Sequence, residues 1–486
     1  MSRLIVMAMA VLLIYGCVQT ETDDAQSVQQ AESAEERLAE GGYADKEKDY
    51  MVPSDYASLE STIGILLNAG NMIGQGHYDE LETAADELER NGEDVSELRE
   101  KLSGLKVASE RNEVFQEENP EDNAVERLPA GLLSPRGCEG TGPRRLGASP
   151  IALEDLQKIL PMGLMSPVHI TPTDHQYWHT AGYFGPEDDK TGLDRFNIYA
   201  PADGFIVEIE TVAGFVDYRV VIEHSCNFYT IFIHIDKLSE KVLSSVKEED
   251  GSAETHAWPR IPVKEGEAIG TIGIGKFDFS VVDEGITLQG FANPESYKGE
   301  PWKIHTAGTF DYYDEPLRSM LLGKNVRAAE PFGGRIDYDI GGKLIGSWFR
   351  ENTNGYRGLG NVNYWESHLS IVYDALDPGH IVVSAGDFGG EARQYGVKGN
   401  SPDPKDIGAE SGIIKYELVP YDYYAGSGKW DGIGFATNLK ARNADEIRGV
   451  ALFQLIGNGK LKAEFFPGKI GSQVQGFTGN AVNYKR

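Results

Sequence analysis

The stretch YAPADGFIV at residues 199–207 decides the character of the central part of this 486-residue chain. Its Pro, Asp and Gly are typical of a turn, and the three apolar residues after them are typical of a β-strand that starts at that turn. Short strands between such turns predict a β domain over residues 150–324. Three further runs have the same character: VVIEH (220–224), TIFIHIDKLS (230–239) and VKEGEAIG (263–270).

The order and spacing of these runs resemble the lysostaphin/LytM-type zinc endopeptidase family. That family has a compact antiparallel β fold, also called the duplicated hybrid motif, and its members cut peptide crossbridges or stems of cell-wall peptidoglycan. The YAPADG run and the V-x-x-G-x-x-I-G run at 263–270 carry the resemblance, together with the middle hairpin and the KFDFSV run at 276–281. The resemblance implies this fold, and a zinc site, for residues 150–324.

A catalytic zinc needs three protein ligands and one open position. In the family, a His and an Asp come from an early loop, and a second His comes from a late His-x-His strand. The resemblance implies His169, Asp174 and Asp278 as metal ligands, with His234 of the middle hairpin as the catalytic assistant. The early spacing is one residue longer than the family's, and Lys276 and Asp278 replace both late histidines.

The two replacements in the late strand change the expected chemistry. Two carboxylates and one imidazole are less characteristic of zinc than two imidazoles and one carboxylate. The ammonium of Lys276 would repel a metal, and it would instead pair with Asp278 or Asp174. We therefore favour a pocket without a cofactor. If the protein is instead an active peptidase, its cofactor is zinc.

Further side chains around these positions are candidate binding residues. Tyr177 and Trp178 are predicted either to stack on a sugar or peptide or to fill a corner of the core. His305 is predicted to close over the cleft of the expected zinc site. The other interpretation is that the histidines and aspartates of this Pro-rich stretch serve as turn and cap residues. The candidates are His175, Tyr177, Trp178, Lys276 and His305.

The N-terminus has the features of an export signal. Arg3 precedes an apolar run at 4–14 that is too short for a permanent membrane span, and Cys17 follows directly after Gly16. A cysteine after a small residue resembles the lipobox of prokaryotic lipoproteins, whose thiol is diacylglycerylated. We expect a signal peptide over 1–16 and a lipid anchor at Cys17, with an ordinary signal peptide as the alternative. The protein is then exported, and held on the outer face of the cytoplasmic membrane or in the cell envelope.

Composition bounds the partners. The formal net charge of −31 argues against a nucleic-acid backbone as partner. If Cys17 is lipidated, Cys138 and Cys226 remain as a pair. An oxidising compartment allows a disulfide between them, and two free thiols are the other interpretation.

The rest of the chain divides by composition. Residues 17–53 predict an acidic flexible stalk, 54–116 a small helical hairpin, and 117–149 a linker rich in Pro and Gly. Residues 325–486 predict a second β domain, a sandwich or barrel, in which Gly-Ser-Trp at 346–348 is of a kind found in lipocalin-like barrels. The fold class is therefore mainly β. Candidate strands of this last domain include 333–340, 344–349, 368–373, 381–385, 412–419, 449–456 and 460–466.

These features favour an envelope lipoprotein with a degenerate, non-catalytic LytM-like domain. Its expected role is to bind or scaffold peptide, glycan or protein partners in the envelope, because relatives without zinc ligands bind and activate other envelope enzymes. The alternative is an active zinc metalloendopeptidase that acts on cell-wall or other extracellular peptides with an altered ligand set. A third interpretation is a purely structural surface protein.

Overall fold

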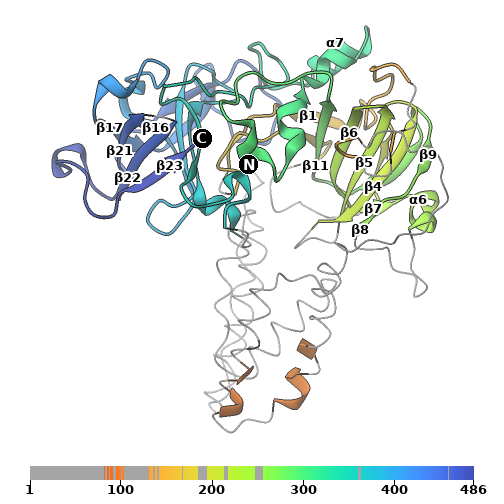
Figure 1. Ribbon diagram of the computed structural model, residues 1–486. Coiled ribbons are helices and arrows are strands. Elements are labelled where there is room, and N and C mark those ends of the chain that lie inside the picture. Colours follow the sequence, from red (N-terminus) through yellow and green to blue (C-terminus); the bar gives the residue numbers. More distant parts are fainter. Residues whose placement is uncertain are drawn as a thin grey trace, which may run out of the picture.

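The computed structural model (Figure 1) describes short stretches between residues 82 and 134 and most of residues 137–486. Within the second range, the gaps are at 139–141, 167, 184–193, 213–216, 247–255, 360–362 and 458. The predicted signal peptide, Cys17 and the predicted stalk lie outside the described residues. Among the described residues, no helix has the length and apolar character needed to cross a bilayer.

A nine-stranded antiparallel sheet is the framework of the central domain. Its strands follow the order β1-β2-β11-β6-β5-β4-β8, with β12 paired to β11 and β9 paired to β4. The strands are β1 (Leu156–Leu160), β2 (Gln176–Thr180), β4 (Gly204–Thr211), β5 (Tyr218–Ser225), β6 (Phe228–Ile235), β8 (His256–Ala257), β9 (Ile261–Val263), β11 (Lys276–Asp283) and β12 (Thr306–Ala307).

A second, three-stranded sheet packs on this domain in the order β3-β10-β7. Two short helices, α6 and α7, accompany the sheets (Figure 1). The elements are β3 (Phe196–Tyr199), β7 (Lys237–Leu238), β10 (Ala268–Ile272), α6 (Glu240–Ser245) and α7 (Leu317–Leu322).

Alternation along β11 separates the core from a polar face. Phe277 and Phe279 are fully buried and contact Trp178 of β2, with ring centroids 6.0 and 5.4 Å apart. Lys276 and Asp278 lie on the opposite face because successive side chains of a strand point to opposite sides. Of the two interpretations of Trp178, the structure supports the core corner, so Trp178 is not part of the polar face.

The C-terminal domain is a closed antiparallel barrel, and the fold class is mainly β as predicted. Trp348 lies in its core, where its indole N–H donates to the Leu344 carbonyl (2.9 Å) and the Arg486 guanidinium lies 4.0 Å from the ring centroid. The barrel strands are β13 (Gly346–Arg350), β14 (His368–Tyr373), β15 (Ile381–Ala385), β16 (Arg393–Val397), β17 (Ile414–Val419), β21 (Gly449–Gly457), β22 (Lys460–Pro467) and β23 (Val482–Lys485).

A small separate sheet has the order β19-β18-β20: β18 (Tyr421–Ala425), β19 (Gly428–Lys429) and β20 (Lys440–Asn443). The predicted strand at 333–340 is wrong, because this stretch forms turns and irregular structure. Its aspartates bind backbone amides of a neighbouring segment: Asp337 accepts from Gly290 N–H at 2.9 Å, and Asp339 accepts from Ala292 N–H at 3.0 Å. Those side-chain bonds satisfy the backbone of the neighbouring segment without a strand ladder.

The barrel packs against the central domain through an aromatic cluster. Tyr297 of the central region contacts Phe349 of β13 and Tyr356, with ring centroids 5.4 and 6.0 Å apart. Beside this cluster, the Gln394 amide of β16 donates to the Ser166 carbonyl at 2.8 Å. The barrel therefore supports the segment that leads into β2.

The described residues of the predicted hairpin are helical near 82–90 and 96–102. Their apolar side chains are buried, while the Arg99 guanidinium pairs with Asp86 at 2.6 Å and Glu89 at 2.5 Å. These ion pairs are exposed, so the apolar contacts contribute more stability than the charges. The buried residues are Ala85, Leu88, Val95, Leu98 and Leu102.

A disulfide joins Cys138 to Cys226, with Cα atoms 5.3 Å apart and a sequence separation of 88 residues. We predict that replacing both cysteines by alanine lowers the free energy of unfolding by roughly 2–5 kcal/mol, because the crosslink restricts the unfolded chain. Urea unfolding of the oxidised proteins measures the difference. Reductant should shift the wild-type curve toward that of the variant and leave the variant unchanged; identical curves in all four conditions would contradict the prediction.

Candidate functional site

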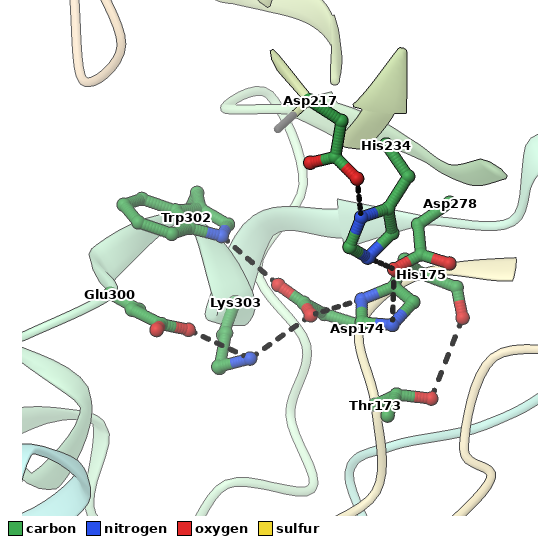
Figure 2. Close-up of polar contacts among 9 residues, drawn as sticks. All are labelled: Thr173, Asp174, His175, Asp217, His234, Asp278, Glu300, Trp302 and Lys303. Carbon is green, nitrogen blue, oxygen red and sulfur yellow. Dashed lines mark hydrogen bonds and ion pairs between the residues drawn. The ribbon is translucent and has the colours of Figure 1, made fainter. Parts of the chain in front are cut away.

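The polar face of the central sheet carries a buried network of charged side chains (Figure 2). Asp174 and His175 lie in the segment just before β2, Asp278 lies on β11, and His234 lies near the end of β6. The fifth member, Lys303, comes from the 3-10 helix η4 (Pro301–His305). Residues from four separate parts of the chain thus meet at one place.

Asp278 lies at the centre of this network. One of its oxygens, Oδ2, is 3.3 Å from Nε2 of His175 and 3.7 Å from Nε2 of His234. The strand register places Asp278 opposite Tyr177 of β2 and Ile233 of β6. Because directly opposed residues of an antiparallel pair share a face, Tyr177 forms a wall beside Asp278.

Both carboxylate oxygens of Asp174 have donors. Oδ1 accepts from the Lys303 ammonium at 3.0 Å and from His175 Nδ1 at 3.3 Å, and Oδ2 accepts from the Trp302 indole N–H at 3.0 Å. Burial alone would raise the pKa of Asp174, but the Lys303 charge and the His175 hydrogen bond outweigh it and hold that pKa well below its usual range. Asp174 is therefore an ionised carboxylate with no oxygen left without a donor.

Lys303 is buried, with 5% of its surface exposed. Its ammonium also pairs with Glu300 at 2.9 Å and lies 4.6 Å from the ring centroid of Tyr356. Burial opposes the charge, but Asp174 and Glu300 outweigh that effect and raise the pKa of Lys303. Since Tyr356 follows β13, the C-terminal domain contributes directly to the surroundings of this ammonium.

His234 forms a second pair with Asp217. Its Nδ1 lies 2.9 Å from the Asp217 carboxylate, which fixes the orientation of the ring and turns Nε2 toward Asp278. His234 has a φ of 73°, in the left-handed region that non-glycine residues seldom adopt. The register of β5 and β6 shifts between Tyr218 and Val220, so a bulge presents this histidine to the pocket.

His175 lies between two carboxylates. Burial by itself lowers its pKa, but the charge of Asp278 and the hydrogen bond to Asp174 outweigh burial, so the pKa of His175 is raised. His169 lies beside it, with ring centroids 5.4 Å apart. Burial, helped by the neighbouring His175 and Lys303 charges, lowers the pKa of His169 to about 3, so this ring stays neutral at physiological pH.

The other predicted site residues are placed differently. The Lys276 ammonium lies 5.7 Å from the ring centroid of Tyr177, and Lys276 pairs in register with His179. The cation on Asp174 is Lys303, where the sequence had suggested Lys276. His305 Nδ1 is 2.6 Å from the Ile286 carbonyl, and this contact does not involve the network.

The pocket does not present a ready set of metal ligands among the described residues. Only one group of three His, Cys, Asp or Glu there has ligand atoms within 4.8 Å of one another, and it consists of Glu208, Glu210 and His256. Arg219 already pairs with Glu208 at 2.6 Å, so a guanidinium supplies positive charge to this group in place of a metal. His169, Asp174 and Asp278 do not form such a group.

Three residues of the network were missed by the sequence analysis: Asp217, Glu300 and Lys303. Asp217 had a usable signal, because the residue before β5 faces the end of β6 in any hairpin that joins the two strands. Lys303 had none, since it follows Asp174 by 129 positions and nothing in the sequence predicts that η4 returns to the pocket.

The arrangement can bind and orient a polar ligand, and it contains an imidazole held by a buried carboxylate. Such a pair can transfer a proton at His234 Nε2. The contacts of the network therefore support acid–base and electrostatic chemistry.

Comparison with known proteins finds distant matches. No protein-family model and no curated protein sequence matches this chain. Among solved structures, the antimicrobial peptidase lysostaphin from Staphylococcus simulans matches with 10% identity and a TM-score of 0.21, over 71% of this chain and 92% of lysostaphin. A solution NMR structure of lysostaphin matches with 10% identity and a TM-score of 0.18, over 68% of this chain and 89% of that one. Similarity at this level is distant and carries no argument about activity.

We predict that Lys303→Met lowers the free energy of unfolding at pH 7 by about 3–5 kcal/mol, because it leaves buried carboxylates without their ammonium. In the wild type, the low pKa of Asp174 contributes stability above the unfolded pKa of about 3.9 and loses it below. In the variant, burial raises that pKa, so acid protonates Asp174 and removes the penalty. Urea unfolding should therefore show the difference between the two proteins shrinking between about pH 5 and pH 3.

Lys298→Met is the matched control, since Lys298 pairs with Glu295 on the surface with 75% of its side chain exposed. It should change stability by less than about 1 kcal/mol at either pH. A Lys303→Met difference that stays constant with pH would show that packing, and not the Asp174 charge, produces the loss.

Proposed function

We propose that this chain is an exported envelope lipoprotein whose LytM-like central domain binds cell-wall peptides without hydrolysing them. The observation that carries this proposal is the buried Lys303 ammonium on Asp174. In the family that the sequence resembles, the residue at this position is a zinc ligand. Here its two oxygens already accept from Lys303, His175 and Trp302, so an ammonium supplies positive charge where a metal would be expected.

The remaining pocket supports a binding role. His175 and Asp278 are buried and held close to each other, and Tyr177 is a partly exposed aromatic wall beside them. Polar groups that are fixed in position beside a partly exposed aromatic ring are of the kind that orients a bound ligand. The C-terminal barrel stabilises it through Tyr356 and Gln394, which fits a scaffold protein.

The anchor is the part of the proposal that concerns the membrane. We predict that the full chain incorporates labelled palmitate when it is expressed in a bacterial host, and that Cys17→Ser abolishes the label, since only the Cys17 thiol can take the acyl glyceryl group. In membrane fractionation, the labelled wild type should be found with the membranes, and Cys17→Ser should be found in the soluble fraction. An ordinary signal peptide predicts no label on either protein and the same soluble fraction for both.

One observation favours the alternative of an active zinc metalloendopeptidase. His234 is held by Asp217 at 2.9 Å and has a left-handed backbone conformation. Strained residues of this kind cluster at active sites. In this alternative, His169, Asp174 and Asp278 would have to rearrange to bind zinc, and Lys303 would have to leave Asp174.

Metal content and wall binding distinguish the two functions. We predict that the purified full chain, dialysed against trace zinc, retains far less than one zinc per chain by elemental analysis. It should co-sediment with insoluble purified peptidoglycan and release no soluble fragments from it.

Near-stoichiometric zinc that is lost in Asp278→Ala but kept in Asp314→Ala, together with released fragments, would establish the peptidase. Asp314 suits as the control because it is a surface aspartate with 77% of its side chain exposed. A folded protein that neither sediments with the wall nor cuts it would overturn both functions.

A further inference from the structure

One oxygen of the central carboxylate has no donor among the residues that the structure describes. Asp278 Oδ2 faces His175 and His234, but no described residue donates to Oδ1, although the side chain is only 6% exposed. A buried charged acceptor that is left unsatisfied is costly, and most such atoms in folded proteins have a partner. This oxygen is therefore open to a hydrogen-bond donor from outside the chain.

The charges around Asp278 indicate which kind of donor. Asp174, Asp217, Asp278 and Glu300 contribute four carboxylates to the network, while Lys303 contributes its ammonium. His175 and His234 are the two imidazoles (Figure 2). Lys276 on the same face of β11 adds a further positive charge, so the four carboxylates are balanced only when both imidazoles are protonated. In every other state the site is negative, which favours a cationic donor over an anionic one.

The wall beside Asp278 already accommodates a cation. The ammonium of Lys276 lies 5.7 Å from the ring centroid of Tyr177, within cation–π range. Tyr177 is partly exposed and lies opposite Asp278 in the strand register, so its ring is the solvent-accessible group next to the buried carboxylate. Lys276 and Asp278 are two residues apart on β11 and share its polar face.

We infer that this pocket binds a primary ammonium group of a peptide, with Asp278 Oδ1 as its acceptor and the Tyr177 ring as its wall. The inference rests on the proposed peptide-binding function and adds the chemical group that is recognised. Two sources of the group share this chemistry: a free peptide N-terminus and the side chain of a lysine-like diamino acid. Lys276 competes with either of them for the same surface.

Isothermal titration of the full chain tests the inference with two matched pairs of probes. The first pair is triglycine amide and N-acetyl-triglycine amide; the second is Nα-acetyl-lysine amide and Nα,Nε-diacetyl-lysine amide. We expect at least one ammonium-bearing probe to bind about 10- to 100-fold more tightly than its acetylated partner, as a hydrogen bond to a charged group provides. The pair that shows the difference identifies the source.

Variants assign the effect to Asp278. Asp278→Asn should remove the preference, while Asp314→Asn, which removes a surface carboxylate, should keep it. Circular dichroism checks that Asp278→Asn is folded. Lys276→Met leaves Asp278 in place and removes the competing cation, so it should tighten binding of the ammonium probe, which tests the pocket even if Asp278→Asn unfolds.

The outcomes separate this inference from the proposed function. Equal affinities within both pairs, or an ammonium preference that survives in folded Asp278→Asn, would overturn the inference, and so would looser binding in Lys276→Met. Those results leave co-sedimentation with peptidoglycan intact if the wall is recognised by other groups. Absence of binding to all four probes overturns the inference, and the proposed function falls with it only when the chain also fails to sediment with the wall.

Discussion

The ion pair between Lys303 and Asp174 is the interaction on which the site depends. It joins η4 to the segment before β2, and it lies where the central domain meets the barrel, because Tyr356 covers the ammonium. Removing charges from water is expensive, and a buried pair is kept only when further hydrogen bonds satisfy both partners. Here Glu300 also pairs with the Lys303 ammonium, and Trp302 and His175 donate hydrogen bonds to the Asp174 carboxylate.

This pair also shapes the chemistry that remains. With Asp174 neutralised by Lys303, His175 is turned toward Asp278 through its other ring nitrogen, and Asp278 becomes the carboxylate with an oxygen to spare. His234 approaches the same carboxylate from β6, oriented by Asp217. The pocket is thus an electrostatic arrangement centred on a carboxylate, which is why we assign it to recognition of a ligand.

The barrel has a structural part in the same arrangement. Closure pairs every strand and leaves no open sheet edge, so a stable body stands beside the central domain. Its outer surface holds the segment before β2 through Gln394 and supplies Phe349 to the aromatic cluster with Tyr297. The positions of Asp174 and His175 therefore depend on a domain that contains none of the network's charges.

Local sequence was sufficient for the fold class and for part of the site. The side-chain period of a strand is two, so the local sequence is enough to put Lys276 and Asp278 on one face of β11, and turn residues predicted the mainly β architecture. The strand prediction for 333–340 was wrong because the aspartates of this stretch bind the backbone of residues 290 and 292. A contact between segments so far apart cannot be predicted from local composition.

Only the tertiary structure decided which cation neutralises Asp174. A lysine two positions from Asp278 was the nearest candidate in the sequence, but the ammonium that arrives is that of Lys303, carried by a distant 3-10 helix. Asp217 likewise reaches His234 through a bulge in the hairpin register. Sequence determines which groups a strand turns to one face, because that periodicity is local; packing between distant segments determines which opposite charges meet, because burial and distance set the strength of those contacts.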